Sequence, residues 1–85
     1  MATWTKTGRW VSSQGTTVIY RLEGTELTVE SRKRHIPHAN GIGTWDCTTY
    51  WVLDDGVEIR ERYSLKDAKA MAENIAEIQR GMGVI

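Results

Sequence analysis

Residues 44–80, TWDCTTYWVLDDGVEIRERYSLKDAKAMAENIAEIQR, contain two β-prone runs followed by one helical pattern. The two runs, at about 44–53 and 57–63, are rich in β-branched and aromatic residues, which favour strands. Asp55 and Gly56 lie between them, and this dipeptide readily adopts the two positive φ angles of a type I′ turn. The segment therefore predicts a tight β-hairpin that leads directly into a helix.

The helix is predicted over about 65–80. Ser64 is a good N-cap, Asp67 completes a pair that resembles a capping box, and Gly81 suits the position after the last helical turn. Apolar residues recur at steps of three and four and form one stripe: Leu65, Ala68, Met71, Ala72, Ile75 and Ile78. Such a stripe has to be buried, and one face of the sheet is the available partner.

Three further runs predict strands at about 4–11, 17–22 and 26–34. The third run alternates apolar and polar residues, as a half-buried strand requires. Short connections between successive runs favour an antiparallel meander. The predicted fold class is α+β: an antiparallel β-meander of about five strands with one C-terminal α-helix packed on one face, in a single domain spanning residues 1–85.

The charge of this 85-residue, 9.7 kDa chain is balanced, with eleven basic and eleven acidic side chains. Residues 1–42 carry six basic and three acidic side chains, and residues 43–85 carry five and eight, so the two parts have charges of +3 and −3. A zero net charge excludes the chain-wide positive field of a nucleic-acid coat or a polybasic membrane anchor. A single Cys excludes an internal disulfide framework. Without a membrane-length apolar run or a signal-peptide pattern, we expect a cytoplasmic location.

A sheet covered by one helix has a covered face and an open face. On the fifth run, one alternating set is expected to face the helix: Val57, Ile59 and Tyr63. The other set is expected on the open face: Glu58, Arg60 and Arg62. The fourth run is apolar on both faces, with Tyr50 and Val52 on one and Trp45, Cys47, Trp51 and Leu53 on the other. A strand of this kind is either central or presents an exposed aromatic residue to a partner.

The candidate partner-binding residues combine Trp with Arg and Lys, and Trp and Arg are enriched at binding hot spots. They are Trp51, Arg60, Arg62, Arg32, Lys33 and Arg34. Arg32-Lys33-Arg34 also opens a basic hairpin that could contact phosphate or an acidic protein surface. Two alternatives remain open. Trp45 and Trp51 could close the small core while the arginines pair with glutamates (Glu23, Glu30 and Glu58), and the hairpin charges could simply prevent strand pairing with other chains.

Metal binding and catalysis are not expected. His35, His38 and Cys47 could supply three zinc ligands, but the nearest fourth, Asp46, is adjacent to Cys47 and would point to the opposite face of a strand. No Gly-rich phosphate loop is present, and no residue orients a Cys–His pair as nucleophile and base. We therefore expect no enzyme activity, no catalytic residues, no metal and no cofactor.

The step Tyr-Ser-Leu-Lys-Asp-Ala at residues 63–68, between a sheet and its C-terminal helix, resembles the arm-site-binding domains of phage-type integrases and the plant AP2-like domains. The resemblance covers about residues 26–80. It implies that the open sheet face enters the DNA major groove, with Arg32, Trp51, Arg60 and Arg62 at the matching positions.

The strand step Tyr-Trp-Val-Leu-Asp-Asp-Gly at residues 50–56 and the helix start Ser-Leu-Lys-Asp-Ala-Lys-Ala at residues 64–70 resemble small accessory proteins of actinobacterial bacteriophages. This resemblance implies a protein in the cytoplasm of a bacterial host that binds a viral or host macromolecule. The function predicted first is a non-enzymatic interaction module that binds a host or viral protein through its open sheet face or basic hairpin, either alone or as a homo-oligomer. The alternative is a nucleic-acid-binding module that uses the same surface.

Overall fold

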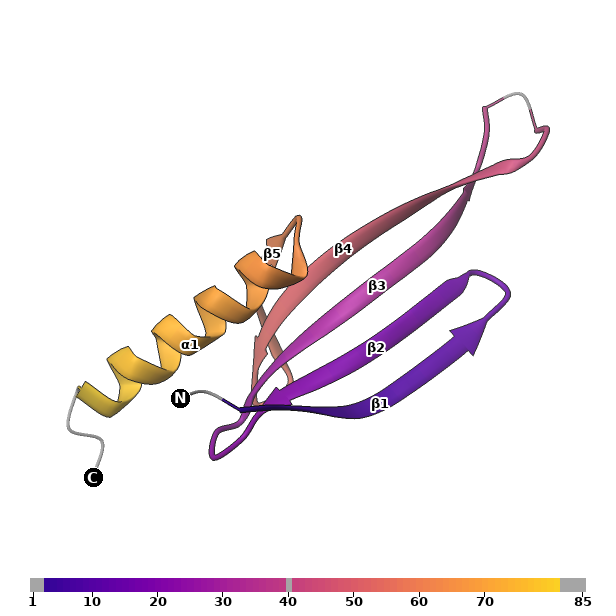
Figure 1. The fold of residues 1–85 in the computed structure, drawn as a ribbon. Coiled ribbons are helices and arrows are strands. Elements are labelled where there is room, and N and C mark those ends of the chain that lie inside the picture. The colour runs from indigo at the N-terminus through magenta and orange to yellow at the C-terminus, as the bar shows by residue number, and fades with distance from the viewer. Residues whose placement is uncertain (1–2, 40, 82–85) are drawn as a thin grey trace.

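The computed structural model describes residues 3–39 and 41–81. Five strands form one antiparallel sheet whose spatial order follows the chain, and one helix follows the last strand (Figure 1). The elements are β1 (Trp4–Ser12), β2 (Gly15–Leu22), β3 (Leu27–Pro37), β4 (Thr44–Asp54), β5 (Val57–Arg62) and α1 (Leu65–Gly81). The predicted α+β meander with a C-terminal helix is therefore confirmed.

The β3–β4 hairpin is longer than the sequence predicted. β3 continues through His35 and Ile36 to Pro37, which pairs with Thr44 at the start of β4. A proline can end a strand in this way because it lacks only the backbone N–H and keeps an extended φ. The two strands pair over eleven residues each, without an interruption in their register.

The core lies between α1 and one end of the sheet. The buried apolar side chains of this cluster are Leu22, Leu27, Val29 and Val52 from the strands and Ala68, Ala72 and Ala76 from the helix. The alanines are spaced by four residues and form one helix face, so the helix can approach the sheet closely. Trp4, Tyr50, Leu65, Met71 and Ile75 pack around this cluster.

The predicted helix stripe is wrong at its C-terminal end. Ile78 is 59% exposed, and Ala76 occupies the buried position instead. Ile78 follows Ala76 by two residues, which rotates its side chain by about 200° around the helix and away from the sheet. In the part of the chain that the structure describes, no helix has the length and apolar character needed to cross a membrane.

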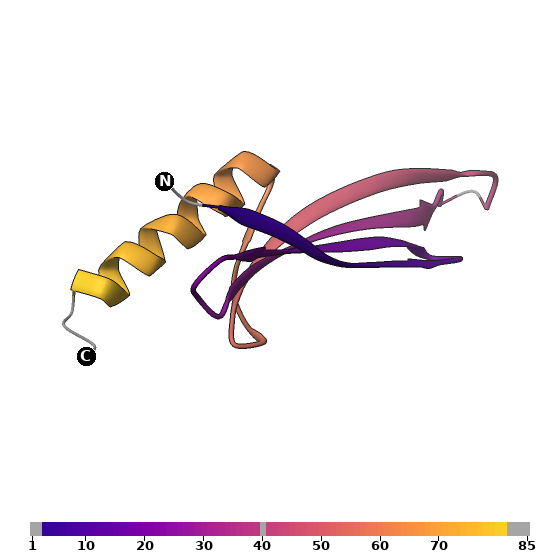
Figure 2. The ribbon, with the colours of Figure 1, turned by 60° about the horizontal axis from the view of Figure 1, so that its bottom comes forward.

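The molecule is elongated, with extents of 54 × 21 × 20 Å and a radius of gyration of 15.1 Å. A compact chain of this length would have a radius of gyration of about 12 Å. The difference arises because β1–β4 extend well past the helix, as Figures 1 and 2 show. We call this extension, residues 8–19, 31–39 and 41–49, the distal arm.

A β-bulge in β5 changes which residues share a face. Arg60 pairs with Val52 but Glu58 pairs with Leu53, so Ile59 is the extra residue between them. A bulge breaks the strict alternation of a strand. Arg60 therefore lies on the face that carries Val52 and the helix, and the prediction that it would share the open face with Glu58 is wrong.

The same register corrects the rest of the fifth strand. Arg62 pairs with Tyr50, so it also lies on the helix side instead of the open face. Val57 pairs with Asp54 and so lies on the helix side as predicted. The three residues predicted to face the helix are nevertheless exposed, and they are Val57, Ile59 and Tyr63. Tyr63 follows the last residue of β5 and is 85% exposed.

Candidate functional site

The six predicted partner-binding residues are divided between the two faces of the sheet. We call the face of Val29 and Val52 the helix-side face and the opposite one the open face. By strand register, the open face holds Arg32, Arg34 and Trp51. The helix-side face holds Lys33, Arg60 and Arg62. The structure therefore does not bring the six together into one surface.

Arg32 and Trp51 do meet on the open face, but the guanidinium is held by two glutamates. Its centre lies 5.2 Å from the centroid of the Trp51 ring. Arg32 Nη2 is 2.9 Å from Glu30 Oε1 and 2.6 Å from Glu58 Oε2. Burial disfavours the charged guanidinium, but hydrogen bonds and charges from Glu58 and Glu30 outweigh it and raise the pKa of Arg32. For Arg32, the alternative of pairing with Glu30 and Glu58 is thus what the structure shows.

Trp4 belongs to the edge of the core. Its Nε1 donates a hydrogen bond of 2.8 Å to Glu73 Oε2 on the helix. The Lys69 ammonium lies 5.5 Å from the Trp4 ring and 4.7 Å from the Tyr20 ring. These contacts fasten β1 and β2 to the helix, so Trp4 has a structural role.

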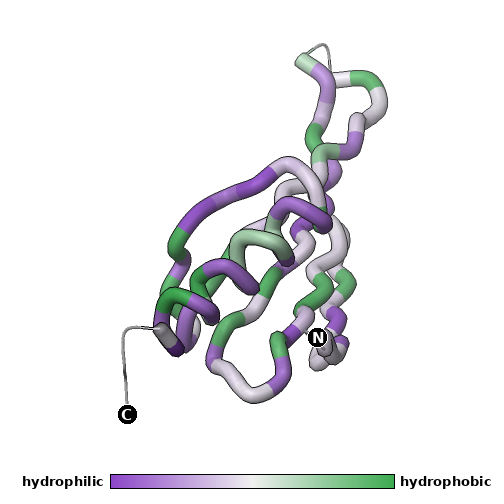
Figure 3. Tube along the Cα trace, turned by 60° about the vertical axis from the view of Figure 1, so that its left-hand side comes forward, coloured by the Kyte–Doolittle hydropathy of each residue, from purple (hydrophilic) through white to green (hydrophobic). Residues whose placement is uncertain are grey.

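The distal arm, by contrast, exposes large apolar side chains. Trp10 is 60% exposed, Trp45 is 47% exposed, and Val11 and Ile42 are also exposed. Trp10 and Trp45 both lie on the open face, opposite Thr17 and Ile36 respectively. Figure 3 shows hydrophobic residues along this projecting part of the chain as well as between helix and sheet.

Trp10 is a candidate that the sequence did not identify, because its strand gave no sign of which face was covered. Its ring lies over Gly8, where an added Cβ would be 2.7 Å from two ring carbons. Gly8 and Trp10 are two residues apart, so both point to the open face. A glycine two residues before a tryptophan in a strand is the sequence signal for such a stacked ring.

Charge on the distal arm is positive. The arm contains four basic residues and one acidic residue, so its charge is +3 and that of the remaining chain is −3. Arg34 lies across β2, where its Nη2 donates to Thr17 Oγ1 at 3.1 Å and its Nη1 donates to Lys33 O at 2.9 Å. The arm is therefore positively charged, and the excess of negative charge lies in the rest of the chain.

Asp46, on the helix-side face of the arm, contacts His35 and Lys33. Its Oδ1 is 2.6 Å from His35 Nδ1, and its Oδ2 is 3.3 Å from Lys33 Nζ. The His35 hydrogen bond is the main cause that lowers the pKa of Asp46 below its ordinary value of 3.8, and Lys33 adds to it. Because the folded-state pKa is depressed, these contacts stabilise the arm above the ordinary pKa of 3.8 and are lost as pH falls through the folded value.

We expect His35→Ala to raise the Asp46 pKa toward its ordinary value, because the largest stabilising partner of the carboxylate is removed. The measurement is an NMR titration that follows the Asp46 carboxyl carbon in wild type and variant. His38→Ala is the matched control and should leave the Asp46 midpoint where it is. An equal midpoint in wild type and His35→Ala would show that the His35–Asp46 hydrogen bond is absent in solution.

Metal ligands are not gathered in one place. Within residues 3–39 and 41–81, no group of three or more His, Cys, Asp or Glu side chains converges as a metal site requires. His35 and Asp46 are paired on the helix-side face, whereas Cys47 pairs with Arg34 on the open face. The expectation that Asp46 and Cys47 point to opposite faces is confirmed.

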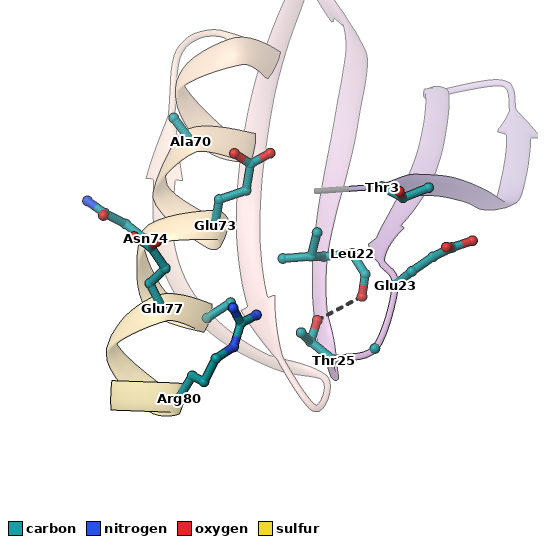
Figure 4. A pocket seen from close by; sticks show the side chains of 11 residues that line it. Thr3, Leu22, Glu23, Thr25, Ala70, Glu73, Asn74, Glu77 and Arg80 are labelled. Carbon is teal, nitrogen blue, oxygen red and sulfur yellow. Dashed lines mark hydrogen bonds between the residues drawn. The ribbon is translucent and has the colours of Figure 1, made fainter. Parts of the chain in front are cut away.

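A groove of about 780 Å³ lies at the other end of the molecule, between α1 and the β2–β3 turn (Figure 4). From the helix, Glu73, Glu77 and Arg80 extend toward it, and Leu22 and Thr25 line its far side. Its lining residues include neither His nor Cys, and the Glu73 carboxylate already accepts the hydrogen bond from Trp4. The groove therefore lacks a paired nucleophile and base of the kind that needs Cys or His.

No protein-family model, curated protein or solved structure matches the chain. The geometry of the molecule is thus the basis for assigning its function.

Proposed function

We propose that this protein is a non-enzymatic interaction module that binds a protein partner through its distal arm. The observation that carries the proposal is the arm itself: four strands extend past the helix and expose Trp10 and Trp45 on the same face as Arg34. Exposed Trp and Arg in one region are typical of binding hot spots, because each buries a large area when a partner arrives. The predicted hairpin is retained in this proposal, and the Arg32–Trp51 cluster is not.

The arm contributes little to the core, which supports a role in binding. The buried cluster between helix and sheet draws its strand residues from the helix-covered end, at Leu22, Leu27, Val29 and Val52. Extending β3 to Pro37 instead adds exposed surface, including a tryptophan at position 45.

The chemistry of the arm favours a protein over a nucleic acid. Lys33 is 3.3 Å from the Asp46 carboxylate, and Arg34 donates to Thr17 and to a backbone carbonyl. Both cationic side chains are partly engaged by partners within the molecule, which leaves little positive charge to contact phosphates. The apolar surface of Trp10 and Trp45 is better matched to a protein. In the proposed setting, the partner is a viral or host protein in the cytoplasm of a bacterial host.

The test is affinity capture with Trp45→Ala and Arg34→Ala variants, followed by a direct binding measurement on the captured protein. Each variant is expected to weaken binding about tenfold or more. Truncating a hot-spot side chain typically costs about 2 kcal/mol or more of binding free energy. Tyr63→Ala is the matched control, since Tyr63 is an exposed aromatic residue between β5 and α1, outside the distal arm. Retained affinity in both arm variants, with unchanged circular dichroism, would contradict the proposal.

Nucleic-acid binding is the second candidate, and the +3 charge of the arm is the observation that favours it. Affinity for duplex DNA would then fall with salt by a slope of about −0.9 for each phosphate neutralised. A mobility-shift assay at low and moderate salt distinguishes the two functions. If the protein binds DNA at micromolar concentration, and both added salt and Lys33→Ala weaken this binding, the partner is DNA and not a protein.

A further inference from the structure

One edge of the distal arm lacks a neighbouring strand. β5 pairs with β4 only from Tyr50 to Asp54. β3 pairs with all of β4, including Thr44–Thr49. Among the described residues, no strand lies on the other side of Thr44–Thr49, and Figure 1 shows β4 continuing well beyond β5 there.

Strand register shows which backbone groups point outward from this edge. Asp55 N donates to Glu26 O at 3.0 Å, so the odd-numbered positions of β4 bond to β3. His35 N donates to Gln14 O at 2.9 Å, so the odd-numbered positions of β3 bond to β2. The even-numbered positions of β3 are thus the ones that bond to the odd-numbered positions of β4. The N–H and C=O groups of Thr44, Asp46 and Thr48 therefore point away from the sheet.

The other edges of the sheet carry features that discourage strand pairing. β1 has a bulge between Lys6 and Gly8, and β5 is a six-residue strand with a bulge and charged side chains. Thr44–Thr49 has no Pro, Lys or Arg, and its register with β3 is uninterrupted. Its single charged residue, Asp46, is already paired with His35 and Lys33. The unpaired N–H and C=O groups of such an edge are a template for pairing with another strand, and natural proteins usually protect them.

We propose that Thr44–Thr49 is the docking edge for an extended strand of the partner protein, which joins the sheet beside β4 as a further strand. This inference rests on the proposed function and specifies how the partner binds. Main-chain hydrogen bonds to Thr44, Asp46 and Thr48 provide affinity, and the alternating side chains provide selectivity. The edge selects a strand with apolar residues on the open face beside Trp45 and Cys47, and with polar or basic residues beside Asp46.

A second copy of this chain fits the edge poorly. In antiparallel pairing about a twofold axis, one register places Asp46 opposite Asp46 of the second copy, which is repulsive. A second register pairs Asp46 with Thr48 and places Thr44 opposite Tyr50. Tyr50 is already paired with Arg62 of β5, so β5 blocks this end of the ladder. Shifting the other way pairs Asp46 with Thr44 and leaves only about three residues in the ladder. A strand from a different protein meets none of these obstacles.

The experiment is an NMR titration of the ¹⁵N-labelled protein with the blocked hexapeptide acetyl-Thr-Val-Lys-Val-Thr-Val-amide. The expected result is a saturable shift of the Thr44, Asp46 and Thr48 amide signals, with a dissociation constant on the order of 1 mM or tighter. The same peptide N-methylated at its lysine and the following valine should produce no shift at these amides. One of those two N–H groups has to face β4 in either register.

Thr48→Pro removes one outward N–H without touching the β3 ladder, and should weaken peptide binding about tenfold or more. Val11→Pro is the matched control. Ser12 and Gly15 flank the two-residue β1–β2 turn and bond to each other, so the N–H of Val11 points outward from the opposite edge. Val11→Pro should leave the dissociation constant within about twofold, because the peptide does not use that edge.

Three results obtained without the partner protein would overturn the inference. The first is the lack of any shift in residues 44–49 at about 5 mM peptide. The second is a shift that N-methylation leaves in place. The third is concentration-dependent sedimentation together with protected outward amides, which would assign the edge to a second copy. If Trp45→Ala abolishes partner capture while Thr48→Pro retains it, strand addition is wrong and the proposed function stands; if neither matters, both are wrong.

Discussion

Gly15→Ala is expected to destabilise the protein by about 2–4 kcal/mol, because the new methyl group meets backbone that cannot move aside. A Cβ at this position would lie 1.9 Å from the carbonyl oxygen of Lys33 and 2.9 Å from Cα of Arg34. The φ angle of Gly15 is +150°, which L side chains rarely adopt. Gly15 also pairs with both Ser12 and Arg34, so relief of the clash would separate β2 from β3.

Urea denaturation followed by circular dichroism measures this effect. Gly81→Ala is the neutral control, since nothing lies near its Cβ, and it should change stability by no more than about 0.5 kcal/mol. Gly24→Ala separates strain from clash, because Gly24 has a φ of +81° but no atom within 4 Å of the added Cβ. If Gly15→Ala is no more destabilising than Gly24→Ala, β2 and β3 are not as close as the structure places them.

Leu27→Ala is expected to cost about 3 kcal/mol, which is a large share of the stability of so small a domain. Leu27, Val29 and Val52 are the largest side chains that are fully buried. A chain of this length has a free energy of unfolding of about 4–13 kcal/mol. Removing most of one of these three side chains leaves a cavity under α1 that the small Ala68, Ala72 and Ala76 cannot fill.

The measurement is the midpoint of thermal or urea unfolding, with Ile78→Ala as the control. Ile78 lies on the same helix that covers Leu27 but is 59% exposed, so its truncation should cost no more than about 0.5 kcal/mol. Equal losses in the two variants would mean that the helix does not pack on the sheet through its alanine face.

The fold could be predicted because its signals are local. Asp55 has a φ of 52° and Gly56 of 81°, as the turn chemistry between the last two strands required. At the helix start, Asp67 N donates to Ser64 Oγ at 3.0 Å, which confirms the predicted cap. Such features depend on residues within a few positions of one another, so the sequence alone identifies them.

The candidate site was harder to predict because it depends on the relative placement of distant strands. Ile59 lies in a bulge that no residue type near it in sequence predicts. Because of this bulge, Arg60 and Arg62 lie on the helix-side face and not on the open face. Arg32 reaches Glu58 across β4, from a strand that is not its neighbour. Nothing near Trp10 or Trp45 in sequence indicates that the helix stops short of them.

The separation of core and arm has a consequence for how the sequence can diverge. The buried cluster and the exposed tryptophans lie at opposite ends of a molecule 54 Å long. Effects of substitutions that far apart are additive, because they share no contacts. Substitutions of exposed residues of the arm, such as Trp10 and Trp45, can therefore accumulate without loss of the packing at the helix-covered end, unlike a substitution at Gly15, where two strands approach closely. A lineage could change the surface of the arm, which we propose binds the partner, while the same fold is inherited intact.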